Sequence, residues 1–284
     1  MKIAHIILAH GNPHQLKRLV SALNNNDDMI FVHLDLKCNL EDFLFLRMVQ
    51  SVVLLPKRFN VQWGGYSLVE ATISAFESVL TSEFAFDYIN LISGQDFPIK
   101  PSSEFRQFLF DNNGSNFMEF HLPGHPWIDE ARLRIERYHF TDYKFKGSTF
   151  LEGVANGILP KKKLPSGFSI IGHSGWFTLT TAAIRYILTF FDDNKSFMRK
   201  FKFSWGSDEF LIQSILYNSS FKETIVNNNL RYIDWSEGKP SPKLLTLLDK
   251  NNIDKSPAFF ARKFDFTVDN QILEYLEQKN SNTI

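Results

Sequence analysis

Cysteine is almost missing from this chain of 284 residues, because Cys38 is the only one. A single cysteine excludes an intramolecular disulfide and a structural zinc site built from several thiolates. Proteins without disulfides are typical of reducing compartments. We therefore predict a cytoplasmic protein.

Long apolar runs are also missing. The N-terminal run, Ile3 to Ala9, is short, and no small-residue cleavage site follows it. It indicates a buried strand rather than a signal peptide or a membrane anchor. Since no basic amphipathic segment is evident either, we expect no transmembrane segment and contact with a membrane only through the substrate.

Neither sign of charge is in excess, because Lys plus Arg and Asp plus Glu each number 31. The chain has no net positive charge that would favour nucleic acid or an anionic membrane as its main partner. We expect no nucleic-acid partner, and any recognition of a polyanion must be local. The 29 phenylalanines suit a dense core and also suit stacking on sugars or bases.

Several motifs of nucleotide enzymes and hydrolases are missing. The chain has no Gly-x-x-x-x-Gly-Lys-Ser/Thr loop and no Gly-x-Gly-x-x-Gly, which argues against P-loop and dinucleotide enzymes. It also has no Asp-x-Asp to hold a divalent metal on a diphosphate. The segment from Gly172 to Gly175 only superficially resembles a Gly-x-Ser-x-Gly elbow, so we do not expect a serine hydrolase.

Strands and helices alternate in the first part of the chain. The hydrophobic pattern predicts strands at Ile3–Ala9, Met29–Leu34, Ser51–Leu55 and Tyr88–Ile92, and helices at His14–Leu23, Ser67–Leu80 and Ser103–Phe110. A capping box of Ser67 and Glu70 is expected to start the second helix. This alternation predicts an α/β fold with a mostly parallel central sheet flanked by helices.

Polar residues follow the predicted strands at the places where those strands end. His10, Asp35, Lys37 and Asp96 hold these positions. Taken singly, each suits a turn. Because ligands bind beyond the carboxyl ends of parallel strands, the set predicts a pocket at this edge.

The second part of the chain is less regular. We predict a strand in Phe168–Thr180 around a Gly-His-Ser-Gly turn, an exposed helix at Asp129–Tyr138, and a solvated loop at Thr141–Leu164. The whole chain, 1–284, is interpreted as a single domain. Its predicted parts are a nucleotide-binding half at 1–115, an acceptor and catalytic half at 116–270, and a C-terminal helix and tail at 271–284.

Two adjacent carboxylates, Asp208 and Glu209, stand at the predicted start of an apolar helix in Trp205 to Leu216. Ser207 suits the N-cap, and the exposed N–H groups and the helix dipole favour acids in the first turn. Such acids are common helix starters, so this stretch alone does not separate a structural role from a catalytic one.

Seven short segments carry a resemblance to one enzyme family. They are VHLDLK (32–37), VQWGGYSLVEA (61–71), INLISGQDFPIK (89–100), GHSGWFTLT (172–180), GSDEFLIQSIL (206–216), LRYIDW (230–235) and FFARKFD (259–265). In order and approximate spacing they resemble the core-2/I-branching β-1,6-N-acetylglucosaminyltransferases and the peptide O-xylosyltransferases. The resemblance implies a GT-A-like fold and an inverting, metal-independent transfer of N-acetylglucosamine or xylose from a UDP-sugar to a hydroxyl of a glycan or glycolipid acceptor.

Glu209 matches the catalytic base of this family. One carboxylate is enough for a single displacement, in which it takes the proton of the attacking hydroxyl. Gly206 and Ser207 stand where the family has a proline. We expect Asp208 to cap the helix or to orient the loop rather than to act as a second acid.

The resemblance also assigns residues to the donor. Lys263 matches a lysine that binds the diphosphate, whose charge needs cationic partners when no metal is used. A second basic residue, either Lys243 or Arg262, is expected to bind the diphosphate together with Lys263. Asp35 matches a residue that contacts uracil, in a pocket that Ala9 and His10 would line.

Other residues have two interpretations. Gln95 and Asp96 lie near the donor sugar or hold their turn in shape. Glu119 and Arg132 correspond approximately to residues that contact the acceptor. Trp176 stacks on a sugar face or belongs to the core.

Animal members of the family are membrane-anchored and rich in cysteine, unlike this chain. The difference predicts a cytoplasmic, bacterial-type enzyme that builds capsular or lipopolysaccharide-type glycans. Two alternatives stay open. One is a non-catalytic protein of the same fold that binds a UDP-sugar or glycan, and the other is a glycoside hydrolase, which would need a second acid facing Glu209.

Overall fold

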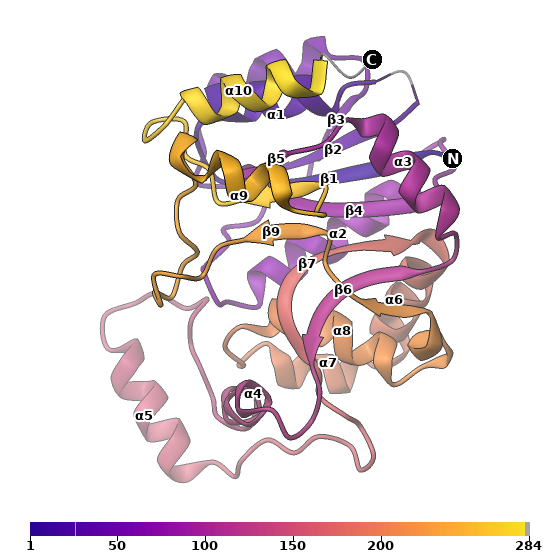
Figure 1. Cartoon of the computed structure of the whole chain (residues 1–284). Helices are drawn as coiled ribbons and strands as arrows, with labels where there is room; N and C mark the ends of the chain where they lie inside the picture. Colours follow the sequence, from indigo (N-terminus) through magenta and orange to yellow (C-terminus); the bar gives the residue numbers. More distant parts are fainter. Residues whose placement is uncertain (26, 282–284) are drawn as a thin grey trace.

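The computed structural model describes residues 1–25 and 27–281. These residues form two β-sheets with helices packed around them (Figure 1). The strands are β1 (Ile3–Ala9), β2 (Met29–Leu34), β3 (Val52–Leu54), β4 (Tyr88–Ser93), β5 (Asp96–Pro98), β6 (Asn116–His121), β7 (Gly172–Thr180), β8 (Ile225–Asn227), β9 (Arg231–Ile233) and β10 (Phe260–Arg262).

The α-helices are α1 (Pro13–Leu23), α2 (Ser67–Leu80), α3 (Ser102–Asp111), α4 (Pro126–Glu136), α5 (Ser148–Ile158), α6 (Thr181–Asp193), α7 (Lys195–Phe201), α8 (Leu211–Tyr217), α9 (Lys250–Lys255) and α10 (Gln271–Ser281). Short 3₁₀ helices occupy Leu40–Met48, Ser207–Glu209, Ser220–Thr224 and Leu247–Asp249.

The central sheet has the strand order β3-β2-β1-β4-β7-β6-β8. Strands β3, β2, β1 and β4 run parallel to one another, β7 is antiparallel to β4 and β6, and β8 is parallel to β6. The predicted α/β class with a mostly parallel central sheet is therefore confirmed. Strands from both 1–115 and 116–270 share this one sheet.

The hydrophobic core lies on both faces of the central sheet. In β1, Ile3 and Ile7 pack with α1 and α10 on one face, whereas Ile6 and Leu8 pack with α2, α6 and α8 on the other. Side chains alternate between the faces of a strand, so a continuous apolar run such as β1 fits a strand that is covered on both sides.

The small sheet brings the C-terminal part of the chain to the carboxyl edge of β4. Strand β10 is antiparallel to β5 and parallel to β9, and its register places Arg262 opposite Asp96. The guanidinium group of Arg231 on β9 joins this sheet to the central one, because it donates hydrogen bonds to the carbonyl oxygens of Leu91 at 2.9 Å and Phe177 at 3.1 Å.

Three expectations about local structure are wrong. The predicted loop 141–164 contains α5, and the Gly-His-Ser-Gly segment lies inside β7 instead of forming a turn. The capping box is not formed, since the Ser67 hydroxyl donates to Asp142 and the Glu70 carboxylate pairs with Lys202 at 3.1 Å.

The C-terminal helix is present as α10, and residues 282–284 of the predicted tail lie outside the described part of the chain. Among the residues that the structure describes, no helix combines the length and the apolar character that crossing a bilayer requires.

Candidate active site

The turn that carries Asp208 and Glu209 is a 3₁₀ helix, Ser207–Glu209, and α8 begins only at Leu211. The Ser207 hydroxyl lies 3.3 Å from the Phe201 carbonyl oxygen and does not cap the helix. The expectation of an α-helical first turn with Ser207 as its N-cap is therefore wrong. A cap by Asp208 is not observed at this turn either.

The position of the turn depends on glycine. Gly206 has φ of 70° and its N–H donates to the Gly64 carbonyl at 2.8 Å, so a residue in the left-handed conformation starts the turn. On β7, a Cβ added at Gly172 would lie 2.2 Å from the carbonyl oxygen of Glu209. The backbone of the turn can approach β7 this closely only because residue 172 has no side chain.

Arg134 on α4 holds the Glu209 carboxylate. Its Nη1 lies 3.1 Å from Oε2 of Glu209, and its guanidinium carbon lies 4.4 Å from the centre of the Trp205 ring. The same guanidinium also pairs with the exposed Glu130. The side chain of Glu209 is 34% exposed, so its carboxylate is accessible from the solvent.

Sequence reasoning assigned no role to Arg134, and its assignment of Arg132 to the acceptor stays a prediction. The structure leaves Arg132 exposed, and two residues along an α-helix turn a side chain by roughly 200°. The spacing of the apolar residues of α4 could have identified Arg134. Ile128, Ala131 and Ile135 are buried, and Arg134 stands three residues after Ala131, which places it next to the buried face of the helix.

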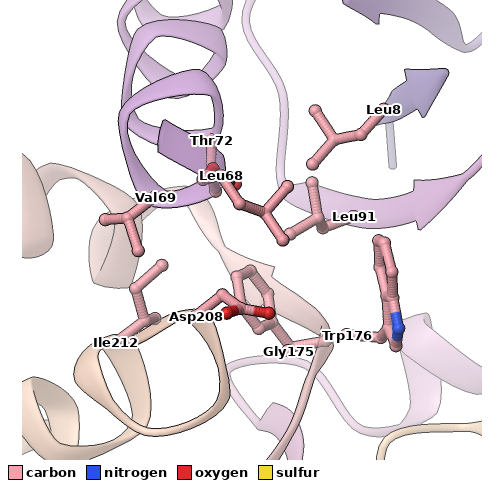
Figure 2. Close-up of a pocket in the computed structure, with 10 residues that line it drawn as sticks. Leu8, Leu68, Val69, Thr72, Leu91, Gly175, Trp176, Asp208 and Ile212 are labelled. Carbon is pink, nitrogen blue, oxygen red and sulfur yellow. Dashed lines mark hydrogen bonds between the residues drawn. The ribbon is translucent and has the colours of Figure 1, made fainter. Parts of the chain in front are cut away.

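The two acids of the turn have raised pKa values. Burial, followed by the nearby Asp208 carboxylate, raises the pKa of Glu209 to about 8, while Arg134 acts in the opposite direction. Burial also raises the pKa of Asp208, against the charges of Arg134 and Arg262. Figure 2 shows the reason for the burial, since Asp208 projects into a pocket lined by apolar side chains that include Leu91.

Arg262 is a second cation whose charge acts on Asp208. Its Nε is 3.5 Å from Asp96, and its guanidinium carbon is 4.3 Å from the centre of the Trp176 ring. In the described part of the chain, Nε and Nη1 of this buried side chain have no hydrogen-bond partner. Trp176, which Figure 2 shows among the residues that line the pocket, therefore lies against the buried cation of Arg262.

Asp96 holds its turn in shape. The side chain is fully buried, and it accepts hydrogen bonds from the Ser93 N–H at 3.0 Å and the Ser93 hydroxyl at 2.8 Å. Of its two interpretations, the structure supports the structural one. Gln95 instead lines a hollow of about 160 Å³, together with His10, at the carboxyl ends of β1 and β4.

The predicted donor residues come together around His10. Burial lowers the pKa of His10, and the charges of Lys263, Lys37 and Arg262 lower it further while Asp35 opposes them. The buried Asp35 carboxylate accepts from Nζ of Lys37 at 2.8 Å. The N–H of Asp35 donates to the carbonyl of Ala9, also at 2.8 Å, which ties the ends of β1 and β2 together.

Lys243 is engaged elsewhere. Its ammonium group lies 2.5 Å from Asp249 and 3.9 Å from Asp234, so two carboxylates neutralise it. Lys263 is half-buried and donates to the Ser241 hydroxyl at 3.2 Å. Of the two candidate partners of Lys263, Arg262 is the one whose guanidinium has nitrogen atoms without a hydrogen-bond partner among the described residues.

Glu119 lies in a group of aromatic and imidazole side chains. Its carboxylate accepts from Asn229 at 2.6 Å and lies 3.8 Å from Nε2 of His173. Burial raises the pKa of Glu119. His121 stacks on His125 with ring centres 3.7 Å apart, and sequence reasoning assigned no role to these histidines.

No described cluster of three or more His, Cys, Asp or Glu side chains has the arrangement to hold a metal ion. The charged groups of the site are a carboxylate pair at the Ser207–Glu209 turn, Arg134 on α4, Arg262 at the end of β10 and Lys263 directly after it. This arrangement can remove a proton on one side and bind an anion on the other.

Residues 3–255 match the family described as Core-2/I-Branching enzyme. The chain belongs to this family. The resemblance to this family is thereby confirmed. Six of the seven segments lie within the matched residues, and FFARKFD (259–265) lies beyond them.

Individual relatives of this chain are distant in sequence. Xylosyltransferase 2 of Rattus norvegicus is 26% identical over 303 residues, covering 98% of this chain and 33% of its own length. Xylosyltransferase 1 of Canis lupus familiaris is 26% identical over 300 residues, covering 98% of this chain and 30% of its own length. The chain thus spans about a third of the length of the curated relatives it matches.

A solved structure of the galactosyltransferase LgtC, in complex with donor and acceptor sugar analogs, aligns over 98% of this chain and 96% of its own. The sequence identity is 9% and the TM-score is 0.44. A likeness at this level supports no conclusion about activity.

The close contact at Gly172 gives a test of the turn. Gly172→Ala should lower the free energy of unfolding by about 1–3 kcal/mol, because the new methyl group meets backbone atoms that must shift. Gly157→Ala on α5, where a Cβ meets nothing within 4 Å, is the matched control and should be neutral or slightly stabilising. Urea unfolding measures both, and equal effects of the two substitutions would contradict the predicted contact.

Proposed function

We propose that this member of the Core-2/I-branching family is a cytoplasmic glycosyltransferase of polysaccharide biosynthesis. It moves N-acetylglucosamine or xylose from a UDP-sugar to a hydroxyl of a glycan or glycolipid acceptor, with inversion and without a divalent metal. The observation that carries the proposal is the Glu209 carboxylate, which has a raised pKa, is partly open to solvent, and is held by Arg134.

Glu209 is the proposed general base. Oε2 is bound to Arg134, which fixes the carboxylate plane and leaves Oε1 to accept a proton. As the acceptor oxygen attacks the anomeric carbon, its proton passes to Glu209 and the bond to UDP breaks on the opposite face. A raised pKa strengthens the base, because a carboxylate with a higher proton affinity abstracts a proton more readily.

Lys263 and Arg262 are the proposed partners of the diphosphate. A leaving diphosphate carries negative charge that cationic donors stabilise when no metal does so. Arg262 is pre-positioned by Asp96 and Trp176, and its unpartnered nitrogen atoms supply donors for phosphate oxygens. In this proposal Asp35, Ala9 and His10 receive the uridine, and Glu119 contacts the acceptor.

Removing the base tests the catalytic proposal. Glu209→Gln should lower turnover of a UDP-sugar by roughly 10²–10⁴-fold while UDP affinity stays unchanged, since the amide cannot accept the proton. Glu130→Gln is the matched control, because Glu130 contacts the same Arg134 from the exposed side. Full activity of Glu209→Gln would refute the assignment, and UDP binding without turnover by the unaltered protein would favour the non-catalytic alternative.

The pH profile tests the electrostatics of the turn. Since the base must be ionised, kcat/KM should rise with pH and level off above the raised pKa of Glu209, which is about 8. Asp208→Asn removes a charge that raises this pKa, so the rising limb should move to lower pH. Arg134→Gln removes a charge that lowers it, so the limb should move to higher pH. Shifts in the same direction would contradict the assignment.

The cation pair gives a separate test of donor binding. Lys263→Ala should weaken UDP binding by about tenfold to a hundredfold, as expected for the loss of a charge-assisted contact. Lys243→Ala should change it less than about threefold, because Asp249 already neutralises that lysine. Calorimetry measures both, and a chelator should leave turnover unchanged. A strict requirement for Mg²⁺ or Mn²⁺ would contradict the proposed role of the cations.

A further inference from the structure

Helix α5 is attached to the protein by its polar side. The side chain of Asn156 donates to the Tyr138 carbonyl at 2.7 Å and accepts from the Tyr138 N–H at 2.9 Å. The Glu152 carboxylate accepts from the Phe140 N–H at 2.8 Å. On an ordinary surface helix the polar face meets water and the apolar face meets the protein. In α5 the polar face is the one that contacts the protein.

The apolar side of α5 faces solvent. Phe150 is 73% exposed and Ile158 is 77% exposed, and Leu151 and Val154 between them are exposed as well. At about 100° per residue these four side chains share an arc of about 100° on the helix. No residue of the helix is buried, and Figure 1 shows α5 at the periphery of the molecule, next to α4.

Positive charge flanks this apolar stripe at both ends. Lys144 and Lys146 precede the helix, and Lys163 follows it, all exposed. The two acids of the segment point inward, since Asp142 accepts from Ser67 and Glu152 accepts from Phe140. The exterior of the segment therefore combines apolar side chains with lysines.

We propose that this surface, named here the α5 surface (Phe150, Leu151, Val154 and Ile158 with Lys144 and Lys146), docks onto a bilayer that contains anionic lipids. The apolar stripe would enter the boundary between headgroups and acyl chains, and the lysines would contact anionic headgroups. With 11 residues the helix is too short to span a bilayer, so it lies along the surface. Lysine is depleted in protein–protein interfaces, which favours a lipid partner.

The α5 surface differs from the expectation that the chain has no basic amphipathic segment and meets a membrane only through its substrate. The chain does contain an amphipathic helix flanked by basic residues, in a segment expected to be a solvated loop. Helix α5 is bonded to Tyr138 and Phe140, just after the helix that carries Arg134. Docking would bring that side of the site to the membrane surface, where the sugar of a glycolipid acceptor lies. Only this last link rests on the proposed function.

Flotation with vesicles tests the proposal. The unaltered protein should float with vesicles of phosphatidylcholine and phosphatidylglycerol in equal parts, and much less with phosphatidylcholine alone. The double variant Phe150→Ser/Ile158→Ser should lose about tenfold or more in vesicle affinity. The matched control is Met48→Ser/Leu248→Ser, which changes two exposed apolar residues elsewhere, 86% and 94% exposed, and should bind normally. Lys144→Gln/Lys146→Gln should reduce binding only to the anionic vesicles.

The proposal is overturned if the unaltered protein does not float with anionic vesicles, or if the control variant loses as much affinity as the α5 variant. A dimer in vesicle-free solution that Phe150→Ser/Ile158→Ser abolishes would overturn it in favour of a second copy as the partner. Glu209→Gln should float normally, and the α5 variant should keep donor hydrolysis and its melting temperature. These two measurements separate failure of docking from failure of the proposed chemistry.

Discussion

The close packing of the Ser207–Glu209 turn against β7 is the constraint on which the rest of the site depends. The carbonyl oxygen of Glu209 occupies the space that a side chain at Gly172 would need. The contact at Gly175 is less close, since an added Cβ would lie 3.2 Å from Oδ2 of Asp208. Because the turn is fixed by a strand of the central sheet, its carboxylates have a defined place relative to the carboxyl ends of β1 and β4. The turn itself starts at Gly206, which has a left-handed backbone conformation.

The charges of the site follow from this placement. Asp208 is forced into apolar surroundings between two arginines, and its own charge disfavours ionisation of Glu209. Arg134 and Arg262 limit the cost of burying two acids, and each is held by an aromatic ring. Asp208, which was expected to cap the helix or to orient the loop, thus raises the pKa of the proposed base. Arg262 adds a second cation directly before Lys263.

Local patterns made much of the fold predictable. The strands β1 and β2 and helix α2 have the predicted bounds, because their apolar periodicity is set by burial in the central sheet and its covering layers. Arg134 was not predicted, because the resemblance pointed to Arg132 and because its partner Glu209 is 75 positions away in the chain. Helix α5 was missed because its apolar side chains are exposed, and the contacts that hold it, from Asn156 and Glu152, are made to residues more than ten positions away.

The stereochemistry of the reaction tests the central claim, a single displacement at a site with one carboxylate base, most directly. Nuclear magnetic resonance at early times can assign the anomeric configuration of the sugar that the protein transfers, or releases to water, from an α-linked UDP-sugar. A β-configured initial product is the predicted result. An α-configured initial product would contradict the claim, because retention requires a different course of reaction from the one in which Glu209 only removes a proton.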